Sequence, residues 1–341
     1  MRALRLEAPG KLAEVRIGVP APAPDELLIE TGAATICTSD LHDLARNPFQ
    51  IPLPRVLGHE AAGVVRELGS AVQGFQPGDR VAAHPVIPCQ DCPNCRRGLG
   101  HLCSRMGHLG LDRDGSFAEF FTLPARRARL ISDAVPAAVG ALLEPVAVSL
   151  EAIVRSGIQA GQTLLVVGDG PFGVLIARLA EVRFHARVLL VGQHDFRMAR
   201  APGAIRIPYR GLQETLAALR AQSPEPEGLD AAILAVGTPS AVELGVESLR
   251  ARGRLVLFSA IESAARLDYF RIHTRELEVV GACNDEDLID DAHACLADPT
   301  LALEQLITHE LPFDQWRRAF DLAQSGQDQA LKVALIFGGA P

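Results

Sequence analysis

The sequence lacks the positive charge that nucleic-acid-binding proteins need. Its 341 residues include 33 Lys and Arg against 41 Asp and Glu, a net charge of −8. We therefore expect neither nucleic acid nor an anionic membrane surface as a partner. Long apolar runs are also missing, since the most apolar window covers residues 134–143 and ends at Glu144, too early for a membrane span. The first 15 residues contain no apolar core of signal-peptide length, so we expect a cytoplasmic protein.

Four of the seven cysteines gather in a segment that has few apolar residues. They follow the spacing C-x2-C-x2-C-x7-C, at Cys89, Cys92, Cys95 and Cys103. Such a segment cannot order itself by burying surface, so we predict that the four thiolates hold a structural zinc ion. An iron–sulfur cluster is the alternative, because it uses similar spacings, and a colourless protein would exclude it. Clustered thiols suit a reducing cytoplasm better than a disulfide framework.

The length predicts two domains, and the pattern changes after about residue 140. Earlier residues form short β-type runs punctuated by Pro and Gly. Later residues alternate strands with helices, which predicts a parallel sheet with crossover helices. The expected strands are 162–168, 186–192, 231–236, 254–259 and 277–282, with a helix over 171–184 and a last strand at 331–337. The predicted fold class is thus α/β combined with β.

A glycine loop follows the first of these strands. Gly168, Gly170 and Gly173 form a G-x-G-x-x-G motif, and Pro171 and Phe172 lie within it. A strand before the motif and a helix after it are the context in which such a loop binds a dinucleotide pyrophosphate at a helix N-terminus. We predict that these five residues bind the cofactor.

The choice between NAD and NADP is expected about 20 residues further on. An NAD site places a carboxylate at the end of the second strand, but this sequence has Gly192, Gln193 and His194 there. The missing carboxylate leaves room for a 2′-phosphate and favours NADP, although Asp195 could still reach the ribose. The candidate partners of that phosphate are His194, Arg197, Tyr209 and Arg210.

A second set of residues suits a catalytic metal. Cys37, His59, Glu60 and Glu144 offer one thiolate, one imidazole and two carboxylates. Three such ligands with a fourth position left for water or substrate are typical of catalytic zinc. Glu144 stands among apolar neighbours, where an unpaired carboxylate would cost several kcal/mol.

In these motifs the chain resembles the zinc-containing medium-chain alcohol dehydrogenases, in particular the polyol, sorbitol and threonine dehydrogenase branch. The matching segments run in family order across nearly the whole chain. They are ICTSDLH at 36–42, GHEAAGVV at 58–65, PGDRV at 77–81, DGSFAEF at 114–120, LEPVAVSLEAI at 143–153, VVGDGPFG at 166–173 and the four-cysteine segment.

The resemblance implies a GroES-like β-barrel over residues 1–145, completed by 284–341, and a Rossmann domain over 146–283. By position it implies two zinc ions per chain. Cys37, His59 and Glu144 would hold the catalytic zinc, with Glu60 as an alternating ligand. Ser39 and His42 would pass the substrate proton to solvent. Subunits of the family pair into dimers or tetramers, so a homodimer or homotetramer is expected.

The function expected from this resemblance is reversible oxidation of a secondary alcohol or polyol to a ketone with NAD(P). Three alternatives stay open at this point. One is oxidation of an amino alcohol such as threonine, and another is a nucleotide-binding or redox-sensing relative without turnover. The third is an enoyl or quinone reductase, although these normally lack both zinc sets.

Overall fold

The computed structural model describes residues 1–224, 227–285 and 287–338. Residue contacts divide the chain into two compact units, one of residues 1–147 and 286–341 and the other of residues 148–285. The first is built on mainly antiparallel sheets and the second on a parallel sheet, which confirms the expected fold class.

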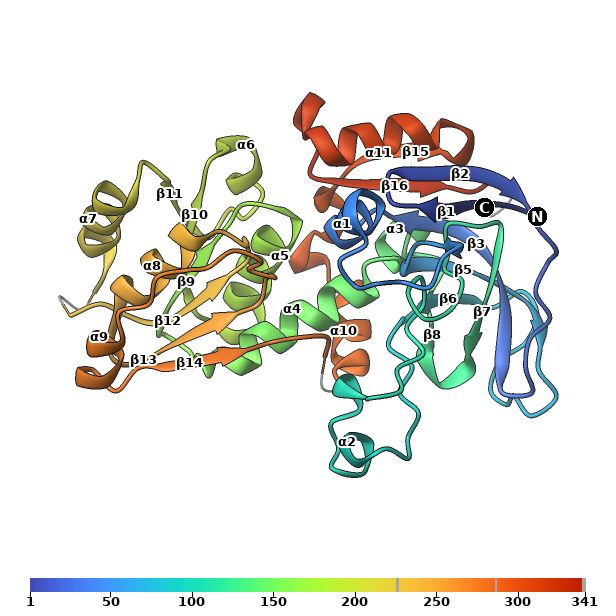
Figure 1. The fold of residues 1–341 in the computed structure, drawn as a ribbon, viewed down its shortest axis with the longest axis horizontal. Helices are drawn as coiled ribbons and strands as arrows, with labels where there is room; N and C mark the ends of the chain where they lie inside the picture. The colour runs from blue at the N-terminus through green and yellow to red at the C-terminus, as the bar shows by residue number, and fades with distance from the viewer. Residues whose placement is uncertain (225–226, 286, 339–341) are drawn as a thin grey trace. The chain divides into compact units, whose positions relative to one another are not determined.

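The second unit contains a six-stranded sheet in the order β11-β10-β9-β12-β13-β14, with all neighbours parallel (Figure 1). This is the strand order of a dinucleotide-binding Rossmann domain. Its first strand, β9, covers Thr163–Val167, and all five residues are buried. The order reverses beside β9, so the loop that follows β9 opens at the crevice where such sheets bind nucleotides.

The elements of this unit agree with most of the expected ones. The helix α5 covers Pro171–Phe184, as predicted, while the short strand β11 was not predicted from the sequence. The remaining elements are β10 (Arg187–Gly192), α6 (Asp195–Met198), β11 (Ile205–Pro208), α7 (Leu212–Gln222), β12 (Leu229–Leu234), α8 (Pro239–Ser248), β13 (Leu249–Leu257), α9 (Tyr269–Thr274) and β14 (Glu278–Gly281).

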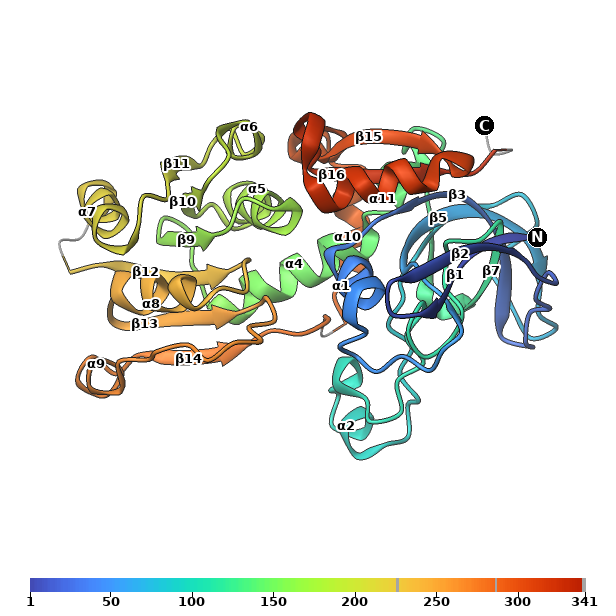
Figure 2. The same ribbon diagram turned by 45° about the horizontal axis from the view of Figure 1, so that its top comes forward.

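The first unit contains a seven-stranded sheet and a three-stranded sheet. The larger one runs β15-β16-β3-β5-β6-β8, with β7 paired to β3, and the smaller runs β2-β1-β4. The C-terminal strand β16 pairs antiparallel with β3, so residues from the end of the chain complete this sheet, as Figure 2 shows. The resemblance predicted this completion by the C-terminal segment.

The elements of this unit have the following bounds. The strands are β1 (Arg2–Ala8), β2 (Lys11–Arg16), β3 (Glu26–Thr35), β4 (Arg55–Val56), β5 (Glu60–Leu68), β6 (Arg80–Ala83), β7 (Phe120–Pro124), β8 (Ala128–Leu130), β15 (Ile307–Pro312) and β16 (Lys332–Ile336). The helices are α1 (Thr38–Arg46), α2 (Pro93–Arg96), α3 (Ala137–Gly140), α10 (Ile289–Leu296) and α11 (Trp316–Ser325).

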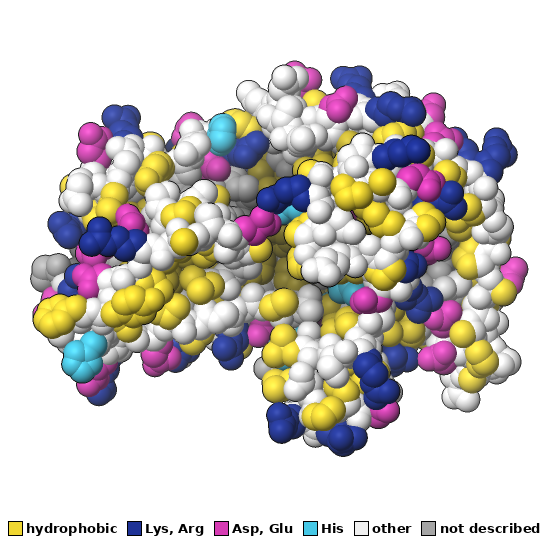
Figure 3. Space-filling view, viewed as in Figure 1, with side chains coloured by type: hydrophobic (Ala, Val, Ile, Leu, Met, Phe, Trp, Pro, Cys, Tyr) yellow, Lys and Arg dark blue, Asp and Glu magenta, His cyan; other side chains and the backbone are white. Residues whose placement is uncertain are grey.

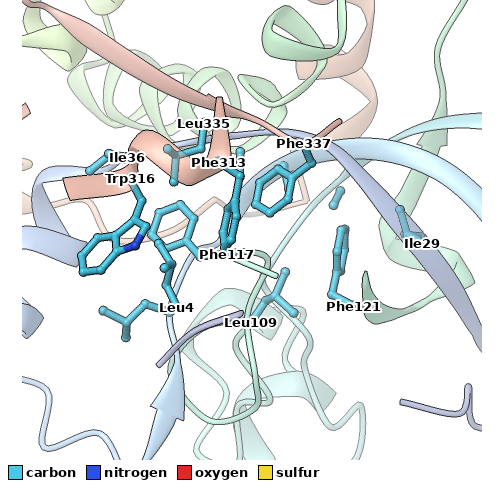
Figure 4. Close-up of a cluster of buried hydrophobic side chains, with 14 of the residues drawn as sticks. Leu4, Ile29, Ile36, Leu109, Phe117, Phe121, Phe313, Trp316, Leu335 and Phe337 are labelled. Carbon is cyan, nitrogen blue, oxygen red and sulfur yellow. The ribbon is translucent and has the colours of Figure 1, made fainter. Parts of the chain in front are cut away.

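The core of the first unit joins distant parts of the chain (Figure 4). Phe313 and Phe337 from the C-terminal segment have ring centroids 4.7 Å apart. Phe117 packs edge-on against Phe320 at 5.6 Å. Buried aromatic side chains of this size contribute several kcal/mol each, and they hold the C-terminal segment against the rest of the unit.

The apolar segment that begins near residue 134 is longer than the sequence analysis predicted. The window at 134–143 does not end at Glu144 but continues through α3 into α4 (Leu143–Ser156). By length and composition, Ala137–Ser156 could cross a membrane, yet 89% of its most apolar stretch is buried inside the protein. Burial to this extent is typical of a helix in the core of a protein.

Candidate functional site

Cys37 and His59 lie together because of strand pairing. The strand β3 ends two residues before Cys37, and β5 begins directly after His59. The two strands run antiparallel with Thr35 opposite Glu60, so the end of one meets the start of the other. Possible ligand atoms of Cys37, His59 and Glu60 consequently lie within 4.8 Å of one another.

Both nitrogens of the buried His59 imidazole have polar neighbours. Its Nδ1 lies 3.3 Å from Oδ1 of Asp40, whose Oδ2 also accepts from the backbone N–H of Cys37 at 2.9 Å. Its Nε2 lies 3.5 Å from Oγ of Ser39. A carboxylate behind a histidine fixes the ring and its tautomer in metal sites. Asp40 therefore directs Nε2 toward the space shared with Cys37, a role that the sequence reading missed.

Glu60 is tied to the C-terminal strand. Its carboxylate is fully buried and accepts from Nζ of Lys332 at 2.7 Å, and it also accepts from the hydroxyl of Thr35. Glu144 is 7% exposed but is not in the group of three ligand residues, and its charge acts on Lys332. The structure thus brings Cys37, His59 and Glu60 together, and the coordination by Glu144 stays a prediction.

The buried donor atoms of this site are of the types that bind a cation, and without one the protein favours protons on them. Burial and the nearby Glu60 carboxylate raise the pKa of the Cys37 thiol. Burial opposes a charge on His59, but the Asp40 carboxylate outweighs it and raises the pKa of His59 well above its usual value. A divalent cation would compensate a buried thiolate beside carboxylates, and sulfur, imidazole and carboxylate are ligands of zinc. The residues present therefore fit a zinc ion.

His108 adds a second imidazole to this region. Its ring centroid lies 5.6 Å from that of His59, and its Nδ1 lies 2.8 Å from the carbonyl oxygen of Leu109. Burial and the neighbouring His59 lower the pKa of His108 to about 3. The sequence reading missed this residue because nothing in its surroundings distinguishes it from a core histidine.

The relay residues predicted from the resemblance lie on α1. Ser39 is beside His59, as described, and His42 follows on the exposed surface of the same helix. Asp43, the next residue, is 1% exposed, and burial together with the charge of Asp40 raises its pKa to about 7.

The four clustered cysteines converge as the spacing predicts. Sulfur–sulfur distances are 3.5 Å for Cys92 and Cys95, 3.8 Å for Cys92 and Cys103, and 4.0 Å for Cys89 and Cys95. A tetrahedron of sulfurs about 2.3 Å from zinc has edges of about 3.8 Å. Backbone N–H groups of Cys95 and Ser104 lower the pKa of Cys92 to about 5, which favours the thiolate form that binds metal. This segment also fits zinc.

The glycine loop has the geometry that a pyrophosphate site requires. Gly168 has a φ of +117°, and a Cβ on Gly173 would lie 1.8 Å from the carbonyl oxygen of Gly168. A Cβ on Gly170 would meet no atom within 4 Å. Pro171 and Phe172 begin α5, whose free N–H groups face this loop. The loop therefore combines a tight turn with close packing of strand and helix.

The predicted 2′-phosphate residues lie at and after the ends of β10 and β11. A Cβ on Gly192 would lie 2.5 Å from Cβ of Asp169, so residue 192 has no room for a side chain, and the expected room for a 2′-phosphate stays a prediction. The N–H groups of Gln193 and His194 donate to Asp169. Of the other candidates, Arg197 lies over the ring of Phe196, and Tyr209 donates its N–H to the carbonyl of Gly192.

The surface carries charges of both signs. On the face drawn in Figure 3, Lys and Arg side chains alternate with Asp and Glu side chains, and no continuous basic surface forms there among the described residues.

Comparisons with known proteins bear on this geometry. Residues 23–133 match the family described as the alcohol dehydrogenase GroES-like domain. The chain is 31% identical over 316 residues to an L-threonine 3-dehydrogenase of Deinococcus deserti, covering 91% of both proteins. The chain belongs to the zinc-containing medium-chain alcohol dehydrogenase superfamily.

Solved structures of other members are similar along the whole chain. A protein of Sinorhizobium meliloti 1021, solved bound to NADP, is 30% identical with a TM-score of 0.90 and 98% of each chain covered. A protein of Escherichia coli CFT073 described as a short chain alcohol dehydrogenase, complexed with NADH, is 27% identical with a TM-score of 0.91 and 99% of each chain covered. This family member is an NAD(P)-dependent and zinc-dependent oxidoreductase that acts on alcohols.

Proposed function

We propose that the protein oxidises a secondary alcohol of a polyol to a ketone, reversibly, at the site formed by Cys37 and His59. The observation that supports this proposal is the buried group of a thiol, an imidazole and a carboxylate within 4.8 Å, beside the hydroxyl of Ser39. These are the residue types that hold a catalytic zinc and leave one position for a substrate. The group lies in the unit that the GroES-like family description matches.

Each residue has a separate role in the proposal. Cys37 and His59 would hold the zinc ion together with the carboxylate of Glu144 or Glu60, and bound zinc makes a hydroxyl acidic, as it lowers the pKa of water from 15.7 to about 7. Asp40 keeps Nε2 of His59 directed at the ligand position. Ser39 accepts the hydroxyl proton of the substrate as it passes its own proton on toward the exposed His42 and solvent. NAD(P) supplies the acceptor for the hydride from the carbinol carbon.

The four-cysteine segment would hold a second zinc ion with a structural role. All four ligand positions are filled by Cys89, Cys92, Cys95 and Cys103, so no position is left for a substrate. Its contribution is the ordering of a segment with little apolar surface.

Metal analysis combined with turnover tests these assignments. We expect two zinc ions per chain in the purified protein. The variants Cys37→Ser and His59→Ala should fold, contain one zinc ion and lose turnover. Cys283→Ser is the matched control, because this cysteine is exposed, and it should retain both zinc ions and activity. Turnover retained by Cys37→Ser would refute the proposal.

Oxidation of L-threonine is a second candidate, favoured by the 31% identity to a threonine 3-dehydrogenase. The hydroxyl of threonine is also a secondary alcohol, so the same metal site would serve. A panel of polyols, sugar alcohols and L-threonine, each with NAD⁺ and NADP⁺, separates the two candidates. A kcat/KM at least about tenfold higher for L-threonine than for any polyol would select the second.

We also propose that two copies associate through the parallel sheet. The strand β14 is at the edge of this sheet, and Val279 on it is 36% exposed. On the adjacent α9, Tyr269 and Phe270 are 75% and 77% exposed, which leaves a large apolar surface in water. Light scattering of the purified protein should give a homodimer or homotetramer, and a monomer at micromolar concentration would contradict the proposal.

The cytoplasm is the location that we propose. All seven cysteines are free of disulfides in the described residues, and the two thiol-based zinc sites require reduced sulfur.

A further inference from the structure

The side chain of Asp169, the second residue of the glycine loop, does not point into solvent. It is 8% exposed, and its Oδ2 accepts hydrogen bonds from the backbone N–H groups of Gln193 at 2.8 Å and His194 at 2.6 Å. The same oxygen lies 3.2 Å from Nδ1 of His194. The loop after β9 thus reaches across to the end of β10 and is fastened there.

This carboxylate occupies the place that a side chain at residue 192 would take. A Cβ built on Gly192 would lie 2.5 Å from Cβ and 2.7 Å from Oδ2 of Asp169. Gly192 is therefore required by the packing of Asp169. In Rossmann domains an acidic residue at the end of the second strand accepts the ribose hydroxyls of NAD. Here a carboxylate lies beside the end of that strand, but it comes from the glycine loop, 24 residues before Gln193 in the chain.

We propose that Asp169 selects the nucleotide and makes the protein prefer NAD(H) over NADP(H). This inference rests on the proposed function only in so far as the chain binds a dinucleotide at the glycine loop. It reverses the preference that the sequence suggested from Gly192 alone.

Two physical effects act in the same direction. First, the N–H groups of Gln193 and His194 are already used by Asp169 and are not available to a phosphate. Second, a phosphate monoester carries a charge of about −1.5 to −2 at pH 7, and the Asp169 carboxylate would repel it. The ribose hydroxyls of NAD carry no charge and can donate to a carboxylate oxygen instead.

The nearby cationic groups do not reverse this balance. The Nδ1 atom of His194 already faces Oδ2 of Asp169, so the imidazole interacts with this carboxylate and is less available to a phosphate. Arg206 pairs with the exposed Asp195 at 2.9 Å. The guanidinium of Arg197 lies 5.5 Å from the ring centre of Phe196. Among the described residues, Arg197 and the exposed Arg210 remain as candidate phosphate partners, and either would have to act against the Asp169 carboxylate.

Nucleotide binding, measured without substrate, tests the proposal. Fluorescence titrations of the full-length protein with NADH and NADPH give both dissociation constants. We expect NADH to bind at least about tenfold more tightly, and Asp169→Ala to reduce this ratio at least about tenfold by weakening NADH and strengthening NADPH. Glu214→Ala, which removes an exposed carboxylate from α7 of the same unit, is the matched control and should leave the ratio unchanged.

Moving the carboxylate to residue 192 should restore the preference for NADH that Asp169→Ala removes. In the double variant Asp169→Ala/Gly192→Asp the acidic group returns to the end of β10, and the preference for NADH should return with it. Circular dichroism of each variant checks that the unit is folded. If Asp169→Ala does not fold, Asp169→Asn keeps the size and should reduce the ratio in the same way.

The outcomes separate this proposal from the proposed function. Equal binding of the two nucleotides by the unaltered protein, a preference for NADPH, or an unchanged ratio in Asp169→Ala overturns the role of Asp169. Selective NADH binding by a protein that turns over no alcohol overturns the proposed function and supports this inference. Binding of neither nucleotide overturns both.

Discussion

The buried ion pair between Lys332 and Glu60 offers a quantitative test of the site. Nζ of Lys332 lies 2.7 Å and 2.6 Å from the two oxygens of Glu60, and the side chains are 3% and 0% exposed. Burial lowers the pKa of Lys332, but Glu60 outweighs this and keeps it above its usual value, so the lysine is charged. Replacing it with Met would leave a buried carboxylate without its cation.

We expect Lys332→Met to lower the free energy of unfolding by about 3–5 kcal/mol, the usual cost of removing one partner of a buried pair. At about 2–4 °C per kcal/mol for a unit of this size, the melting temperature should fall by about 10 °C. Calorimetry of the zinc-loaded protein and urea titration at fixed zinc concentration measure the two quantities.

Two further variants make the test specific. The double variant Glu60→Gln/Lys332→Met removes both charges and should recover most of the loss, because neither charge is then left buried alone. Arg252→Met breaks an ion pair with Glu276 in which the side chains are 78% and 66% exposed, and it should leave the melting temperature nearly unchanged. A double variant that is as unstable as Lys332→Met alone would refute the reasoning.

Three other predictions follow from the same unit. Asp40→Asn removes the carboxylate behind His59 and should weaken binding of the catalytic zinc by about 10- to 100-fold in a chelator competition, with no effect on the structural zinc. Cys92→Ser should reduce the zinc content by one ion per chain and make the segment around it susceptible to proteolysis, whereas retained zinc would argue against the structural site. Asp43 keeps its proton in the folded protein up to a pKa of about 7, whereas an unfolded aspartate ionises near pH 4, so folding stability falls as the pH rises from 4 to 7. Asp43→Asn should therefore raise the melting temperature at pH 8 and change it little at pH 4, and an equal shift at both pH values would contradict this.

Much of the fold was readable from local patterns. The helix over 171–184 and the strand before it were predicted within a residue, because a buried parallel strand, a glycine loop and an apolar helix each leave a contiguous pattern. The strand β11 was missed because it has four residues and ends at a proline. The apolar segment that continues past Glu144 was misjudged because a single charged residue interrupts it, although the helix runs on.

The sequence by itself determined the chemistry that depends on residue type and short spacing. Three sets of residues could be recognised because each stands in a short sequence motif. They are the four cysteines, the glycines at 168, 170 and 173, and the segments around Cys37 and His59. Only the tertiary structure decided the partners of these groups. Lys332 reaches Glu60 across 272 residues, and Asp169 reaches Gln193 across 24, through strand pairing and loop packing that no local pattern encodes. The physical reason is that a buried charge is stabilised by whichever group the fold places beside it, wherever that group stands in the chain.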